Sequence, residues 1–127
     1  MRTAERLKDE KVIWLTTISP RGVPQPNPVW FYWDEKSIIV YSQPTSHKVK
    51  NIARNPNVAL NFQVNGEGGN VVVLTGDGSL DQHPSTHDPR YFEKYRDEIA
   101  RIGFTPESLA STYSVLTKIL PSKLRGM

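Results

Sequence analysis

The chain has 127 residues, with 16 lysines and arginines against 13 acidic residues, and it contains no cysteine. This length predicts a single domain over residues 1–127, or one subunit of an obligate oligomer. The absence of cysteine excludes a disulfide scaffold, cysteine-ligated zinc, iron–sulfur clusters and thiol catalysis. No apolar run approaches the ~20 residues of a membrane helix, and the polar, acid-containing N-terminus is unlike a signal peptide. We therefore expect a cytoplasmic protein that does not associate with membranes.

The net charge of +3 is concentrated in two segments of the chain. Residues 46–66 contain three basic side chains and no acid, and the same is true of residues 112–127. The rest of the chain has ten basic and thirteen acidic residues and sums to −3. The excess positive charge therefore lies in these two segments rather than over the whole surface. Its functional role depends on what the two segments bind.

The first half of the chain contains mostly predicted strands. Residues 3–10 form a short amphipathic helix, and residues 12–18, rich in β-branched and aromatic side chains, form a strand. Three prolines and a glycine predict a turn over residues 20–26. The aromatic run 29–33 and the apolar run 38–42 are separated by a short polar turn, which predicts a β-hairpin.

The second half adds helices between the strands. A short helix over residues 46–54 precedes a strand at residues 58–64, where apolar and polar residues alternate. A flexible turn at residues 65–69 leads into a strand at residues 71–80, whose two glycines predict a bulge or a close approach of backbones. A longer helix over residues 88–103 follows, with an aspartate N-cap, a proline as its first residue and a glycine as its stop.

A short helix from Thr105 and a closing strand over residues 113–120 complete the prediction. The six short strands with turn signals between them predict a mainly β protein. Such strands favour a small antiparallel barrel over a parallel sheet.

The aromatic run near the N-terminus alternates between two faces. Trp30 and Tyr32 are predicted on one face, and Phe31 and Trp33 on the other. One face is then free to line a pocket for a flat ring while the other packs into the core. Packing of both faces in the core and in a dimer interface is the alternative.

A metal site is not predicted. Two histidines and two aspartates lie between residues 81 and 88, but prolines flank them and favour a polar loop. With no cysteine and three histidines in the chain, this loop more simply leads to the N-cap of the following helix.

The helix at residues 46–54 carries its cations at the unfavourable end. With Thr45 or Ser46 as N-cap, Lys48 and Lys50 fall in the first turn, where the helix dipole opposes a positive charge by roughly 0.3–1 kcal/mol each. An anion bound at the helix start removes this conflict, because free N–H groups, hydroxyls and ammonium groups would converge on it. A solvated basic face on a surface loop is the alternative.

The order of these segments is similar to that of a known family. A G-x-P turn leads into N-P-V-W at residues 27–30, a hairpin strand ends at Ser42, and S-H-K-V-K-N-I-A-R-N-P follows at residues 46–56. This order resembles the pyridoxamine 5′-phosphate oxidase-like split β-barrel superfamily, and more closely its actinobacterial, deazaflavin-dependent branch. The resemblance extends over residues 7–125 and is most specific over residues 48–56.

The resemblance implies a six-stranded split β-barrel that forms a homodimer with two cofactor sites at the subunit interface. It implies that the cofactor phosphate is held by the end of a strand and the first turn of the basic helix, namely by Ser42, Gln43, Thr45, Ser46, Lys48, Lys50 and Asn51. It implies that the ring of the cofactor lies along Asn27, Pro28, Val29 and Trp30. Lys48 matches the family best, whereas the family often has arginine where this chain has Ser46 or Lys50, and lysine offers a point charge in place of a bidentate contact.

The tail of the chain is the second basic segment. Since C-terminal residues of this superfamily can lie near the interface site, Lys123 and Arg125 are candidates to hold an anionic cofactor tail. A frayed, solvated tail is the alternative.

The function that the resemblance implies is that of an F420H2-dependent reductase, which transfers a hydride from coenzyme F420 to a small organic acceptor. No catalytic acid, base or nucleophile is evident in the sequence, as expected where the cofactor performs the hydride chemistry. An FMN-binding oxidase or flavin reductase of the same fold, and a non-catalytic cofactor-binding protein, stay open. Nucleic-acid binding is not predicted, because no recognised motif accompanies the two basic segments.

Overall fold

The computed structural model describes residues 3–62, 72–84 and 86–126 of the chain. Seven antiparallel strands form one curled sheet in the order β2-β1-β5-β6-β7-β4-β3. The strands are β1 (Ile13–Ile18), β2 (Pro24–Val29), β3 (Tyr32–Trp33), β4 (Ile38–Ser42), β5 (Asn57–Asn61), β6 (Val72–Asp81) and β7 (Val115–Gly126). The helices are α1 (Thr3–Asp9), α2 (His47–Arg54), α3 (Pro89–Lys94), α4 (Arg96–Arg101) and α5 (Pro106–Thr112). The predicted turn at residues 65–69 lies outside the described residues.

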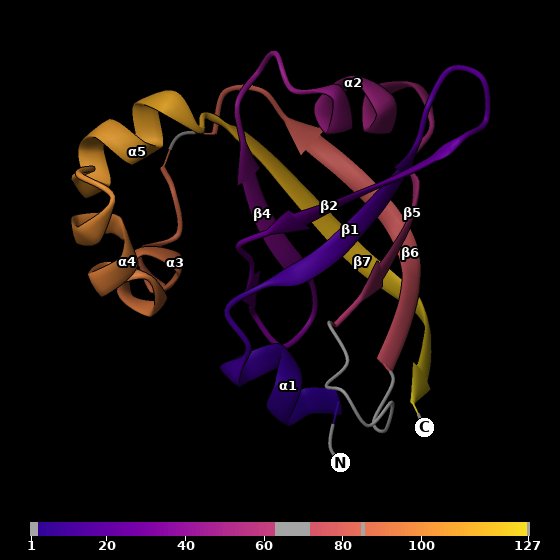
Figure 1. Cartoon of the computed structure of the whole chain (residues 1–127), viewed down its shortest axis with the longest axis horizontal. Helices are drawn as coiled ribbons and strands as arrows, with labels where there is room; N and C mark the ends of the chain where they lie inside the picture. The colour runs from indigo at the N-terminus through magenta and orange to yellow at the C-terminus, as the bar shows by residue number, and fades with distance from the viewer. Residues whose placement is uncertain (1–2, 63–71, 85, 127) are drawn as a thin grey trace.

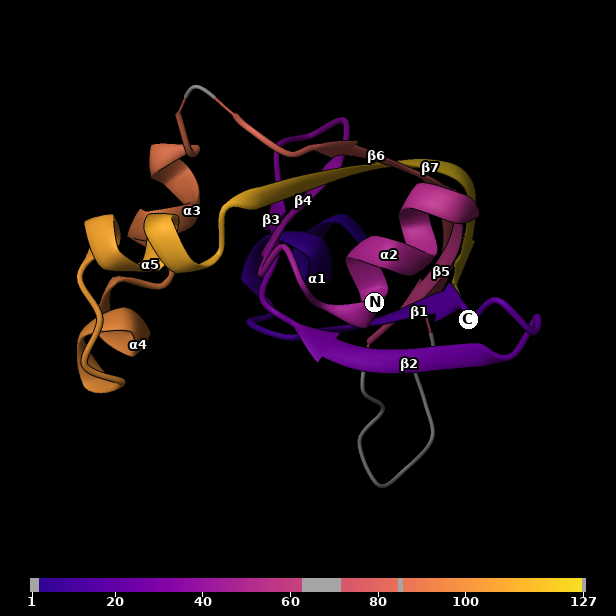
Figure 2. The ribbon, with the colours of Figure 1, turned by 90° about the horizontal axis from the view of Figure 1, so that it is seen from above.

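The sheet curls into a half-barrel whose two edge strands are β2 and β3 (Figures 1 and 2). Helix α2 covers one end of this half-barrel and α1 lies at the other end (Figure 1). The mainly β, antiparallel class predicted from the sequence is confirmed. The described residues form seven strands rather than the predicted six.

The additional strand is β2, where the sequence predicted a turn. Pro24, Pro26 and Pro28 pair with alternate residues of β1. Successive N–H groups of a strand point to opposite sides. The three prolines occupy alternate positions, so the residues between them can still donate their N–H groups to β1. Because β2 lies at the edge of the sheet, the side that lacks donors has no further strand to pair with.

The aromatic run 29–33 is also shorter as a strand than predicted. Val29 ends β2, and only Tyr32 and Trp33 pair with β4. The predicted alternation is nevertheless confirmed, because the side chains divide between two hydrophobic cores. Of the odd members, Phe31 belongs to the barrel core and Trp33 packs against it, whereas the even members, Trp30 and Tyr32, pack against a second core.

The barrel core fills the concave side of the half-barrel. Strand β5 contributes Val58 and Leu60, and Phe62 follows, with exposed fractions of 5%, 0% and 1% as the alternation predicted. The predicted close approach in β6 occurs at Gly76, where the register shifts and an added Cβ would collide with the backbone carbonyl of Leu120.

Helices α3, α4 and α5 form a helical unit beside the half-barrel (Figure 2). Its core contains Tyr91, Tyr95, Ile99 and Leu109, packed against Ile39 and Tyr41 of β4. The single helix predicted over residues 88–103 is wrong in one respect, since Tyr95 leaves the helical conformation with φ −111° and ψ 19° and separates α3 from α4.

The predicted ends of these helices are confirmed. The Asp88 side chain accepts a hydrogen bond from the Arg90 backbone N–H at 2.9 Å as N-cap of α3. Gly103 stops α4 with a φ of +84°, and Thr105 forms a capping box with Ser108 at the start of α5.

The last strand continues past the predicted end at Pro121. Pro121 pairs with Gly76 at the register shift, where the ladder is already irregular, and β7 then pairs with β6 up to Gly126. The backbone of Lys123 and Arg125 is therefore part of the sheet, opposite Thr75 and Val73. The alternative of a frayed tail therefore does not hold for the backbone of this segment, whereas the predicted contact of Lys123 and Arg125 with a cofactor tail stays a prediction.

Candidate functional site

The start of α2 has the form predicted from its cations. Ser46 is the N-cap with an extended backbone, and its hydroxyl makes no capping hydrogen bond. The first turn of the helix contains no acidic residue. The hydroxyl oxygens of Ser46 and of Ser42, at the end of β4, are both buried without a hydrogen-bond partner in the part of the chain that the structure describes. Two hydroxyl groups near the helix start thus lack a partner among the described residues, although neither lines the cavity described next.

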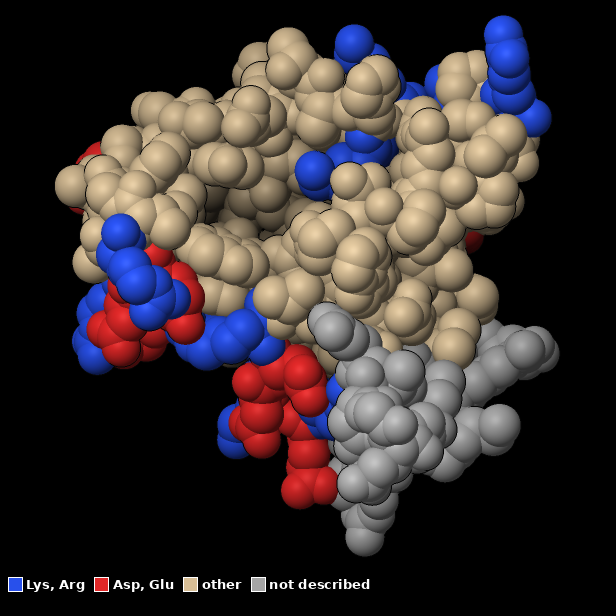
Figure 3. All heavy atoms as spheres, viewed as in Figure 1, with Lys and Arg blue, Asp and Glu red and all other residues tan. Residues whose placement is uncertain are grey.

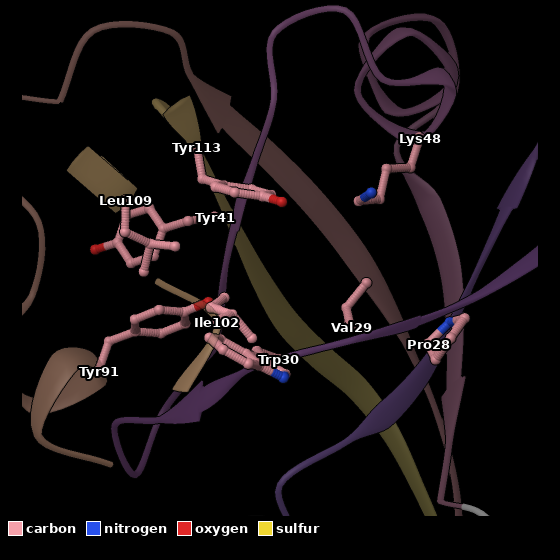
Figure 4. A pocket seen from close by; sticks show the side chains of 9 residues that line it. All are labelled: Pro28, Val29, Trp30, Tyr41, Lys48, Tyr91, Ile102, Leu109 and Tyr113. Atoms are coloured by element: carbon pink, nitrogen blue, oxygen red, sulfur yellow. The ribbon is translucent and has the colours of Figure 1, made fainter. Parts of the chain in front are cut away.

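Lys48 does not point into solvent but lines a cavity of about 220 Å³ (Figure 4). The cavity lies between the half-barrel and the helical unit, and Figure 3 shows the corresponding hollow with basic side chains at one rim. Its barrel wall consists of Pro28, Val29, Trp30, Tyr41 and Lys48, and its helical wall consists of Tyr91, Ile102, Leu109 and Tyr113.

The electrostatics of Lys48 distinguish it from a surface lysine. Burial lowers the pKa of its ammonium group, because the charged form loses solvation there. Within the described residues, no carboxylate lies within ion-pair distance of Lys48. An anion therefore binds with a more favourable free energy beside this half-buried cation, which has no counter-ion, than beside an exposed lysine.

Trp30 is a fixed flat surface on the barrel wall. Its indole stacks on the Tyr95 ring, with 4.5 Å between centroids and 6° between planes. The Tyr95 hydroxyl accepts a hydrogen bond from the Phe31 N–H at 2.9 Å and donates one to the carbonyl of Lys11 at 2.7 Å. Lys94 adds a hydrogen bond to the Phe31 carbonyl at 3.0 Å. These contacts anchor the backbone beside Trp30 and hold its ring in one orientation.

Tyr41 connects the barrel wall to the helical unit. Its hydroxyl accepts a hydrogen bond from the Asp88 backbone N–H at 2.8 Å, and its ring stacks on His87 with 4.1 Å between centroids. The His87 Nε2 atom lies 2.9 Å from the carbonyl oxygen of Tyr113. Burial raises the pKa of Tyr41, so its hydroxyl is protonated at neutral pH. The position of the helical wall therefore depends on these polar and stacking contacts.

The sequence-predicted residues separate into three groups. Pro28, Val29, Trp30 and Lys48 line the cavity together. Ser42 and Ser46 lie near the start of α2 with unpartnered hydroxyls, as described above. The others are outside the cavity lining, namely Asn27, Gln43, Thr45, Lys50 and Asn51.

Asn51 has a structural task within the chain. Its side-chain nitrogen donates hydrogen bonds to Thr17 Oγ1 at 2.9 Å and to Gln25 Oε1 at 2.8 Å. Its side-chain oxygen accepts one from Arg54 at 3.1 Å. These bonds tie α2 to β1 and β2, and so help to set the direction of Lys48 on the same helix.

Sequence reasoning missed Tyr41 and the whole helical wall. The four residues of the helical wall come from a segment more than 40 positions beyond Lys48. The one signal that could have indicated them is the number of tyrosines among the apolar residues of the helical segment, since a buried tyrosine needs a partner for its hydroxyl.

The described residues contain no group of histidines, cysteines and acids that could hold a metal ion. In the same part of the chain, no helix is both long and apolar enough to cross a membrane.

The fold and the cavity together define a split-barrel protein, in which a curled antiparallel sheet and a small helical unit enclose an aromatic site with one half-buried cation. The family model of pyridoxamine 5′-phosphate oxidase matches residues 2–126. The chain therefore belongs to the pyridoxamine 5′-phosphate oxidase family.

Solved structures with this fold have diverse descriptions. An F420 reductase is similar with a TM-score of 0.73 and 22% identity, covering 98% of both chains. HutZ, the heme storage protein from Vibrio cholerae, has a TM-score of 0.68 and 15% identity over 96% of this chain and 89% of its own. General Stress Protein 26 from Bacillus anthracis has a TM-score of 0.69 and 21% identity over 92% and 84%. No curated protein matches the chain.

Proposed function

We propose that this protein binds the reduced deazaflavin coenzyme F420 and directs its hydride to a small organic acceptor. The observation that carries the proposal is Lys48, a half-buried cation without a counter-ion in the described residues, at the edge of an aromatic cavity. A ligand that combines an anionic group with a flat ring satisfies both features. The similarity to an F420 reductase supports this choice of ligand at the level of the fold.

The residues present fit such a cofactor. The ammonium of Lys48 offers a donor to a phosphodiester from the cavity wall, and the orphaned hydroxyls of Ser42 and Ser46 lie buried near the start of the same helix. The fixed indole of Trp30 offers a flat apolar surface to a ring. The predicted ring-binding residues Pro28 and Val29 belong to the same wall.

The site is proposed to be completed by a second copy of the chain. A cavity of about 220 Å³ is smaller than the ≈ 300–1,000 Å³ of typical ligand pockets. Ile102, on its rim, is 53% exposed although it is apolar. A homodimer that covers this rim would enlarge and close the site, in keeping with the interface sites that the family resemblance implies.

Each wall then has a separate task in the reaction. When bound, the reduced cofactor supplies the hydride. Lys48 holds its anionic group, and Trp30 orients the ring by stacking. The tyrosine-rich helical wall faces the acceptor and excludes water from it. No residue of the chain needs to act as a nucleophile.

FMN is the second candidate cofactor. The same lysine would serve its terminal phosphate, and the family model that matches the chain is named after an oxidase. The two cofactors differ in reaction with oxygen, so the cofactor decides between a reductase and an oxidase.

The experiment is a calorimetric titration of the purified protein with F420, FMN and heme, followed by turnover with F420H2 and a panel of conjugated acceptors. Binding of F420 with a Kd below the high micromolar range, together with acceptor reduction, supports the proposal. Yellow protein that retains flavin through a column favours FMN. Binding of heme alone, or of a cofactor without turnover across the panel, would instead favour a storage or carrier protein.

A further inference from the structure

Three tyrosines line the cavity, and their hydroxyls have different surroundings. The hydroxyl of Tyr41 points away from Lys48 toward the helical unit, where it is bonded to the Asp88 N–H (Figure 4). The hydroxyls of Tyr91 and Tyr113 point into the cavity (Figure 4). Neither of these two hydroxyls has a hydrogen-bond partner among the residues that the structure describes.

Tyr91 is the more informative of the two, because its residue is only 3% exposed. Its hydroxyl oxygen is not among the buried unpartnered oxygens of the described residues, which are those of Ser42 and Ser46, so the small exposed part of Tyr91 includes this oxygen. The one open direction for the Tyr91 hydroxyl is the cavity itself. A partner for this hydroxyl must therefore come from the contents of the cavity.

The Tyr91 ring cannot turn its hydroxyl elsewhere. It packs edge-on against Tyr41 at 4.8 Å and against Phe92 at 5.9 Å between centroids, and it is tilted against Tyr95 at 5.2 Å. Burial, with Tyr95 and Tyr41 nearby, raises the pKa of Tyr91. The group is thus a fixed, neutral hydrogen-bond donor throughout the ordinary pH range.

We propose that the helical wall is the acceptor subsite, which takes a planar conjugated ring with a carbonyl oxygen, and that the Tyr91 hydroxyl donates a hydrogen bond to this oxygen. The flat ring fits between aromatic and aliphatic side chains of the cavity. A carboxylate would lose more solvation there than one neutral hydroxyl returns, which favours a neutral oxygen as the ligand atom. Such a bond withdraws electrons from the conjugated system, which is the polarisation that a hydride acceptor needs. That the bound ring accepts a hydride rests on the proposed function, whereas the binding of a ketone at this subsite does not.

The test compares two probes of similar shape, acetophenone and ethylbenzene, which differ in the carbonyl oxygen. Each is titrated into ¹⁵N-labelled, cofactor-free protein, with the indole N–H of Trp30 on the opposite wall as the reporter. We expect acetophenone to bind about 3- to 10-fold more tightly, the ratio that one net hydrogen bond provides.

The variant Tyr91→Phe removes the hydroxyl and keeps the ring. It should bind ethylbenzene as the wild type does and lose the preference for the ketone, so that the ratio of affinities falls to about 1. Tyr32→Phe is the matched control, because it removes the same group from a tyrosine outside the cavity lining, and it should keep the ketone preference. A wild type without preference, a failure of both probes to bind, or a Tyr91→Phe protein that still prefers the ketone overturns the proposal.

A second measurement covers the case in which Tyr91→Phe does not fold. In wild-type protein labelled with ¹³C at the tyrosine Cζ atoms, the Tyr91 resonance should shift with acetophenone and stay in place with ethylbenzene. The opposite result, or equal shifts, rejects the hydrogen bond. Because no cofactor is present in these titrations, failure of F420 to bind contradicts the proposed function and leaves this result unaffected.

Discussion

Replacement of Lys48 by methionine is the sharpest test of the cavity as an anion site. Methionine keeps a long apolar side chain on α2 and removes only the charge and its donors. A hydrogen bond between a charged group and a ligand contributes about 1.5–3 kcal/mol, which corresponds to an increase of about 10- to 150-fold in the Kd of the anionic cofactor. We expect the effect of Lys48→Met to fall in this range because the Lys48 ammonium is half-buried and has no ion-pair partner within the described residues.

The same change should have the opposite effect on the protein without ligand. Because burial lowers the pKa of Lys48, the unfolded chain binds its proton more tightly than the folded chain does. The charge therefore opposes folding below the lowered pKa, and this cost disappears as the pH rises toward the ordinary lysine value. Lys48→Met should be at least as stable as the wild type at neutral pH, and the difference should close near pH 10.5.

Calorimetry with F420 and thermal unfolding with and without ligand measure both effects. Lys36→Met, an exposed charge in the β3–β4 turn, is the control for net charge and should leave the Kd unchanged. Lys50→Met should have a smaller effect than Lys48→Met, because Lys50 is exposed and outside the cavity lining. An unchanged F420 affinity of Lys48→Met, or a clear loss of stability without ligand, would refute the reasoning.

Three further predictions concern the framework of the site. Asp88→Ala removes the N-cap of α3 and should lower the free energy of unfolding by about 1 kcal/mol in urea titrations. Gly76→Ala should cost at least about 2 kcal/mol, because its Cβ would collide with a backbone carbonyl of β7, whereas Gly78→Ala meets a movable side-chain methyl at 3.2 Å and should cost less. Burial lowers the pKa of Lys94 to about 8, so the unfolded state binds more protons above that pH. The stability of the wild type relative to Lys94→Met should therefore rise from pH 8 to about 10, and a flat difference would contradict this assignment.

Several local features could be read directly from the sequence. The hairpin of β3 and β4, the start of α2 at Ser46 and the N-cap at Asp88 depend on turn and cap residues close in the chain. The cations in the first turn of α2 could be recognised for the same reason, since the helix dipole acts mainly within the first turn. The conflict that they create indicated the position of the candidate site.

Local rules failed where position in the sheet decides what a residue can do. The prolines and the glycine of residues 20–26 predicted a turn, but an edge strand accepts Pro24, Pro26 and Pro28 because their missing donors face no partner. Tyr95 similarly interrupts a helix that its neighbours would continue, at the residue whose ring and hydroxyl hold Trp30 and Phe31. In both cases a contact with a distant segment determines the local conformation.

The sequence by itself thus determined the class of fold, the two faces of the aromatic run and the location of the cations in the first turn of α2. These properties follow from the period of a strand and from the ends of a helix, which a few neighbouring residues encode. Only the tertiary structure decided that Lys48 faces an aromatic cavity and that Tyr91 and Tyr113 form its other wall. Those residues meet because the packing of the helical unit on β4 and Trp30 brings them together, and no local pattern specifies which distant faces will meet.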